Sequence, residues 1–95
     1  MPELRFSVRW PDGSVDECYS PSTVVKEHLQ AGADYPLAEF LARSRAALHG
    51  ASERVRARYG YSCSSAMEQL ARIEHKAGAF AGEPAAQVRI ERFSS

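Results

Sequence analysis

The side chains best suited to chemistry in this sequence are two cysteines and three histidines. Cys63 lies in the segment YGYSCSSAMEQL, directly after Ser62, a good N-cap residue for the helix that the following pattern predicts. Free backbone N–H groups and the positive end of the helix dipole stabilise a thiolate at such a position. However, Cys63 also falls on the predicted apolar stripe of Ala66 and Leu70, and a buried cysteine there is inert. The pattern thus leaves a reactive thiol or a small core residue as alternatives and favours the core residue.

Cys18 is the second thiol, at the end of a predicted strand, where it could meet Cys63 in a two-layer domain. The pair could act in redox chemistry or, with His28, form part of a metal site. No C-x-x-C or H-x₃₋₅-H spacing supports either role. His49 and His75 lie on other predicted elements. We therefore predict no metal site and no cofactor, and keep Cys63 and Cys18 only as candidates for thiol-dependent catalysis.

A second candidate site joins three arginines to two serines. Arg54, Arg56 and Arg58 occupy the last two turns of a predicted long helix, and Ser62 and Ser64 begin the next one. Guanidinium groups and the free N–H groups of a helix start both bind oxyanions, so these residues could hold an anion or an acidic partner. Arginines also pack their stems beside an apolar stripe without any ligand, and serines cap helices. The alternatives stay open.

Composition and motifs narrow the function classes. Twelve basic and twelve acidic residues cancel, which argues against a nucleic-acid binder. No run of about 18 apolar residues predicts a membrane span, and MPELRFSVRW lacks the apolar region of a signal peptide. Two cysteines without an export signal indicate reduced thiols, so we expect a cytoplasmic protein. Nucleotide-binding, nucleophile-elbow and zinc-protease motifs are absent from the sequence.

Charge is segregated along the chain. Residues 1–35 hold three basic and six acidic side chains, a sum of −3, and residues 36–59 hold five and two, a sum of +3. Such polarity matters for docking a partner more than for solubility.

The clearest predicted element is a hairpin around the turn WPDGS. Apolar residues alternate with polar ones from Leu4 to Trp10, which predicts a strand with one apolar face, and a second strand returns over residues 15–19. Its register is open. A three-residue Pro11-Asp12-Gly13 loop turns Cys18 inward, whereas a two-residue turn directs Val15 inward instead.

Two main helices and a last strand follow. Ser20 before Pro21 predicts the start of a short helix, and QAGADYP predicts a loop. A long helix should run over residues 37–59 with Gly50 on its outer face, and the next should begin at Ser62. The segment AAQVRIERF alternates like a strand.

The long helix carries one apolar stripe at 100° per residue. Its predicted members are Leu37, Phe40, Leu41, Ser44, Leu48, Ala51, Val55 and Tyr59.

The predicted fold is a single α+β domain over residues 1–95, of order β-β-(α)-α-α-β. We expect a two-layer arrangement in which a three-stranded sheet, the hairpin plus the C-terminal strand, packs on the two main helices.

Four segments together carry a family resemblance: RWPDGS, ECYSPS, ASERVRARYG and CSSA. With them the chain resembles, from Met1 to about Ile73, the small bacterial nitrogen-starvation response proteins encoded in nitrilase-containing gene clusters. The resemblance implies a cytoplasmic protein linked to nitrile or cyanide nitrogen metabolism, and it assigns no catalytic residue.

The function we expect is that of an accessory protein. It would bind a partner enzyme of that cluster, or a second copy of itself, through an exposed sheet edge or the arginine-flanked helix. The alternative is a thiol-dependent enzyme or small-ligand carrier using Cys63 with Cys18.

Overall fold

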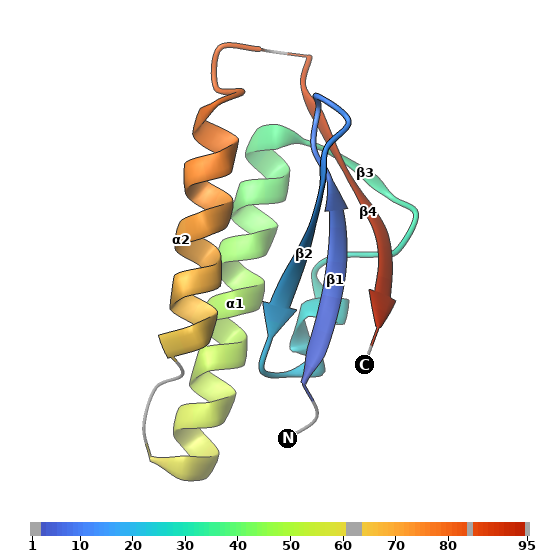
Figure 1. Ribbon diagram of the computed structural model, residues 1–95. Helices are drawn as coiled ribbons and strands as arrows, with labels where there is room; N and C mark the ends of the chain where they lie inside the picture. The colour runs from blue at the N-terminus through green and yellow to red at the C-terminus, as the bar shows by residue number, and fades with distance from the viewer. Residues whose placement is uncertain (1–2, 61–63, 84, 95) are drawn as a thin grey trace.

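A computed structural model describes residues 3–60, 64–83 and 85–94. A sheet forms one layer and a pair of helices the other (Figure 1), which confirms the α+β class. In chain order the described elements are β1 (Leu4–Arg9), β2 (Val15–Ser20), the 3₁₀ helix η1 (Thr23–Glu27), β3 (Asp34–Pro36), α1 (Leu37–Tyr59), α2 (Ser64–Gly78) and β4 (Gln87–Ser94).

The core lies between the helix pair and the inner face of the sheet. Burial of these apolar side chains is the main driving force for holding the two layers together. The largest fully buried apolar side chains are Phe6, Phe40, Leu29, Leu48, Ile73 and Ile90.

Within the described residues the sheet has four antiparallel strands in the order β2-β1-β4-β3. The prediction of three strands was wrong, because β3 lies in the segment predicted to be a loop. Three residues are too few for an alternating pattern to show in the sequence. Tyr35 is buried in β3 and pairs with Val88. Pro36 has no N–H group, which suits a strand at the edge of the sheet.

The hairpin register follows from its loop. Trp10 N donates to Ser14 O at 2.8 Å, and Gly13, with a φ of 89°, donates to Trp10 O at 2.9 Å. These bonds close a three-residue loop, the first of the two predicted alternatives. Consequently Cys18 points inward and Val15 is 46% exposed.

The short helix begins later than predicted. Ser22, rather than Ser20, is its N-cap, and the Ser22 hydroxyl accepts from Val24 N at 3.3 Å. Ser20 ends β2 instead, and its hydroxyl donates to Ser22 O at 2.7 Å. The β-branched residues 23–25 are crowded in an α-helix, and here they form a short 3₁₀ turn.

The long helix matches its predicted bounds. Gly60 ends α1 with a φ of 82°, and its N–H donates to Arg56 O at 2.7 Å. Most of the predicted stripe is buried or partly buried, but Tyr59 is 49% exposed. In Figure 1 the last turns of α1 extend past the end of the sheet, so none of the described strands covers that side chain.

Gly50 does not lie on an open outer face as predicted, because η1 packs against that side of α1. A Cβ added at Gly50 would meet the two Val24 methyl groups at 3.8 and 3.9 Å, which is ordinary van der Waals contact. We expect Gly50→Ala to raise the free energy of unfolding by about 1 kcal/mol, since alanine favours the helix over glycine by that amount. Urea denaturation would measure the change, and a loss of stability would contradict this packing of η1.

Ser44 is the polar exception on the buried stripe. Its side chain is buried, and its hydroxyl has no hydrogen-bond partner within the described residues. We expect Ser44→Ala to raise the free energy of unfolding by about 1 kcal/mol, because a buried hydroxyl without a partner costs stability. Thermal unfolding followed by circular dichroism would test this. Destabilisation would show that the hydroxyl has a partner in solution.

Candidate functional site

The three candidate arginines lie on α1 where the sequence placed them, and all are exposed. Each interacts with a side chain of its own chain. The partners of Arg54, Arg56 and Arg58 are, in that order, Glu27 at 3.5 Å, Glu53 at 3.8 Å and the ring of Tyr59 at 5.8 Å. Exposed pairs of this kind contribute little stability, so these contacts leave the guanidinium groups accessible at the surface.

The rest of that candidate site is only partly described. Ser64 is the first residue of α2 and is exposed. Ser62 and Cys63 lie outside the described residues. The anion or partner site made of these serines and the arginines therefore stays a prediction.

Cys18 is a core residue. It lies on the inner face of β2 and is only 1% exposed. Burial, together with the smaller effects of the nearby negative charges of Asp16 and Glu17, raises the pKa of its thiol to about 12. Since the thiolate is the nucleophile, a thiol with this pKa offers little of the reactive form at neutral pH. Within residues 3–60, 64–83 and 85–94, no three His, Cys, Asp or Glu residues form a group that could hold a metal ion.

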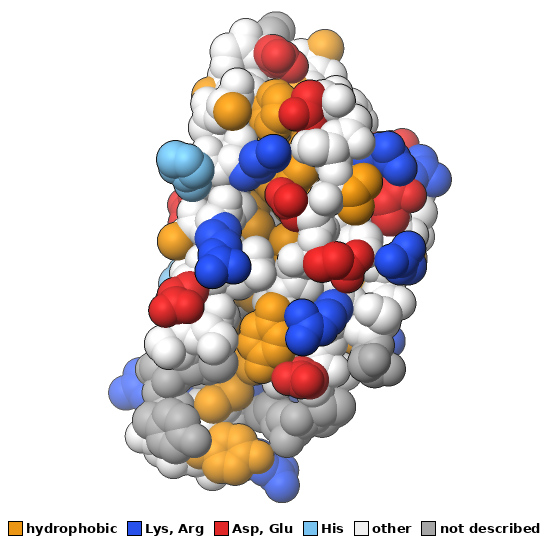
Figure 2. All heavy atoms as spheres, in the orientation of Figure 1, with side chains coloured by type: hydrophobic (Ala, Val, Ile, Leu, Met, Phe, Trp, Pro, Cys, Tyr) orange, Lys and Arg blue, Asp and Glu red, His pale blue; other side chains and the backbone are white. Residues whose placement is uncertain are grey.

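A hollow of about 180 Å³ opens beside Cys18, between strand β2 and helix α2. We call it the β2–α2 groove. Figure 2 shows hydrophobic side chains along the middle of this face, with charged side chains on both sides. The residues that line the groove are Trp10, Asp16, Glu17, Cys18, Gln69, Arg72 and Ile73.

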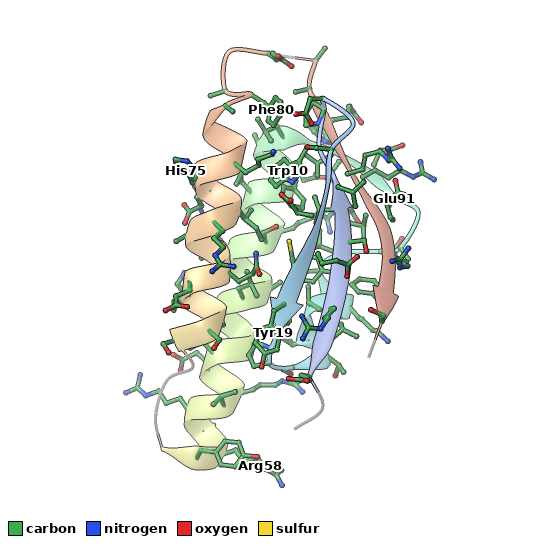
Figure 3. The ribbon with its side chains drawn as sticks, in the orientation of Figure 1. Trp10, Tyr19, Arg58, His75, Phe80 and Glu91 are labelled. Carbon is green, nitrogen blue, oxygen red and sulfur yellow. The ribbon has the colours of Figure 1, made fainter. Side chains whose placement is uncertain are left out.

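Trp10 anchors one end of the β2–α2 groove. Its ring stacks on Phe80 at 6.1 Å and meets Phe40 edge-on at 5.6 Å, so its position is fixed by packing (Figure 3). Its indole Nε1 donates to Asp16 Oδ2 at 2.8 Å. The groove therefore has a rigid apolar end whose one polar atom already has a partner.

Gln69 fastens helix α2 to the strand on the other side of the groove. Its Oε1 accepts from the backbone N–H of Tyr19 at 3.0 Å. This bond also shows that the Tyr19 N–H points away from β1. Because alternate residues of a strand share one direction, the N–H groups of Val15 and Glu17 also point outward. Within the described residues no strand pairs with this outer edge of β2.

Arg72 is the cationic residue among those that line the groove. Asp16 accepts from the indole of Trp10, and Glu17 accepts from the Ser7 hydroxyl and lies 3.6 Å from Arg92. Among the described residues, no side chain forms a hydrogen bond or ion pair with Arg72. The helix wall of the groove therefore presents a guanidinium that can still bind a carboxylate.

Sequence reasoning did not select Trp10, Gln69 or Arg72. The alternation from Leu4 to Trp10 marked the tryptophan as a core residue, which it is. Gln69 and Arg72 look like the solvated face of an amphipathic helix, since their spacing beside Ile73 is ordinary. Only the strand order, which places β2 at an edge, gives them a possible role.

A comparison with models of protein families shows which family this chain belongs to. The model described as "Nitrogen starvation-induced protein NitG" matches residues 5–93. The chain belongs to the NitG family. The match confirms the resemblance to nitrogen-starvation proteins and extends it past Ile73, through α2 and β4.

Two further observations bear on this NitG family member. No curated protein and no solved structure matches its chain. None of its described helices combines the length and the apolar character needed to cross a membrane.

Proposed function

We propose that this NitG family member is a small cytoplasmic accessory protein that binds another protein during nitrogen starvation. The surface we assign to this binding is the outer edge of β2 together with the β2–α2 groove. One observation carries the proposal: within the described residues no strand pairs with the outer edge of β2, and the groove beside it holds Arg72, to which no described side chain is bonded. Exposed strand edges are ready templates for pairing with another chain.

The family resemblance suggests where to look for the partner. It implies that these proteins are encoded with a nitrilase and serve nitrile or cyanide nitrogen metabolism. We therefore propose that the partner is an enzyme of such a gene cluster.

A second copy of the chain is a less suitable partner for the same edge. Antiparallel pairing of two β2 strands would bring Asp16 and Glu17 of one copy close to those of the other. Like charges on adjacent strands destabilise pairing. A different protein that offers a complementary strand fits the edge better.

The alternative of a thiol-dependent enzyme or small-ligand carrier draws no support from Cys18. A thiol whose pKa is raised to about 12 carries almost no thiolate at pH 7. Cys63, the other thiol of that proposal, lies outside the described residues.

Site-specific photocrosslinking in nitrogen-starved cells tests the proposal. A photoreactive amino acid at Val15 should crosslink to one enzyme of the cluster, whereas the same group at Glu53, exposed on α1, should not. The two proteins, purified separately, should then form a complex in analytical ultracentrifugation. Equal crosslinking from both positions, or no complex between the purified proteins, would overturn the proposal.

A further inference from the structure

The geometry of the β2–α2 groove points to a particular mode of recognition, and the identity of its natural partner rests on the function proposed above. We propose that an extended peptide segment adds to the outer edge of β2 as a fifth strand and places an acidic side chain on Arg72.

The backbone supplies the first argument. The N–H groups of Val15 and Glu17 point outward, and the next outward N–H, that of Tyr19, is already bonded to Gln69. The hairpin loop ends the free edge on the other side, at Ser14. The open stretch is therefore short and fits a segment of about three to five residues in an extended conformation.

The size of the hollow supplies the second argument. A volume of about 180 Å³ is smaller than small-molecule pockets, which usually range from about 300 to 1,000 Å³. It is suited to a single side chain rather than to a cofactor. In an added strand every second side chain would point toward α2, so one aliphatic side chain could contact Ile73 and the thiol of Cys18.

The guanidinium of Arg72 supplies the third argument. Asp16 is bonded to Trp10, and the carboxylate of Glu17 is engaged by Ser7. Both carboxylates belong to β2, whereas the guanidinium of Arg72 belongs to α2. An acidic side chain directed toward α2 finds the Arg72 guanidinium, whose fork of donors matches a carboxylate.

A peptide selection tests the proposal without knowledge of the partner. The probe is a phage-displayed library of random heptapeptides, selected on the immobilised full chain and counter-selected on its Val15→Pro variant. Proline removes the outward N–H and is tolerated at the start of an edge strand. Enriched peptides should hold an acidic residue near aliphatic or β-branched residues and should lack proline.

Matched variants then locate the binding by fluorescence polarisation. Arg72→Glu should weaken an enriched peptide at least tenfold, as should Val15→Pro. Arg58→Glu makes the same charge change at the far end of α1 (Figure 3) and should change the affinity less than twofold, as should Val15→Thr. Circular dichroism and Trp10 fluorescence confirm that each variant is folded.

Two results would overturn strand addition: no peptide enriched over the Val15→Pro decoy, or peptides that bind all variants equally. The peptide-binding test and the photocrosslinking test can fail independently of each other. A partner that crosslinks at Val15 but binds Val15→Pro normally would keep the accessory role and exclude the added strand. Selective peptides without any natural partner would keep the recognition mode and exclude the assigned role.

Discussion

In the folded protein, Cys18 is expected to react with iodoacetamide at pH 8 about a thousand-fold more slowly than in the urea-unfolded chain. The thiolate reacts, and raising the pKa from 9.0 to about 12 lowers its fraction at pH 8 from about one in ten to about one in ten thousand. Burial of the sulfur slows the reaction further. Mass spectrometry of peptides after timed labelling would measure the rate for Cys18 separately from that for Cys63.

The same pKa predicts how stability depends on pH. Above about pH 9 the thiol ionises in the unfolded chain but stays protonated in the folded one, so the folded state binds more protons. The free energy of unfolding should therefore fall as pH rises from about 9 toward 12, by at most about 1.4 kcal/mol per pH unit from this group. Below pH 9 the contribution is constant.

Cys18→Ala is the control for both measurements. It loses some packing at every pH, but it should lack the alkaline slope that Cys18 contributes. Equal slopes in the two proteins, or fast labelling of folded Cys18 at pH 8, would show that the thiol is exposed. The thiol-enzyme alternative would then regain support.

Replacing Trp10 by alanine is expected to lower the free energy of unfolding by about 3–5 kcal/mol. Trp10 is buried, contacts Phe40 and Phe80, and closes one end of the β2–α2 groove. Large aromatic-to-alanine changes in a core cost this much because they remove the contacts and leave a cavity. Urea denaturation followed by circular dichroism would measure the loss, since the variant has no tryptophan.

Trp10→Phe separates packing from the indole hydrogen bond. Phenylalanine keeps an aromatic ring against its neighbours but leaves Asp16 without its 2.8 Å donor. We expect a smaller loss than for alanine, since Asp16 is exposed and water can replace the donor. Equal losses for the two variants would mean that the hydrogen bond, rather than the stacking, holds Trp10 in place.

The elements that could be predicted are those with a local signal. The hairpin, the long helix and the last strand each repeat an apolar pattern at a fixed period, and Gly60 ends α1 for a local reason, its positive φ. Strand β3 was missed because three residues hold no period. The position of Gly50 was mistaken because the apolar stripe of α1 gives no sign of η1 packing on its other side.

The groove could not be predicted for a different reason. The inward position of Cys18 was one of two alternatives, and loop geometry decides between them. The placement of Gln69 and Arg72 beside an open strand edge depends on which strand lies at the edge, and that order depends on contacts between distant segments. Nothing in the local sequence around either residue differs from a solvated helix face.

The central position of the β1–β4 pair has a consequence for synthesis of the chain. The two middle strands of the sheet are Leu4–Arg9 and Gln87–Ser94. During translation β1 can pair with β2 early, but it can pair with β4 only after β4 has left the ribosome. Until then the core lacks the buried side chains of β4, Val88 and Ile90, and closing so long a loop slows folding. Prematurely terminated chains should therefore stay unfolded and be substrates for proteases, so that only chains that include β4 accumulate.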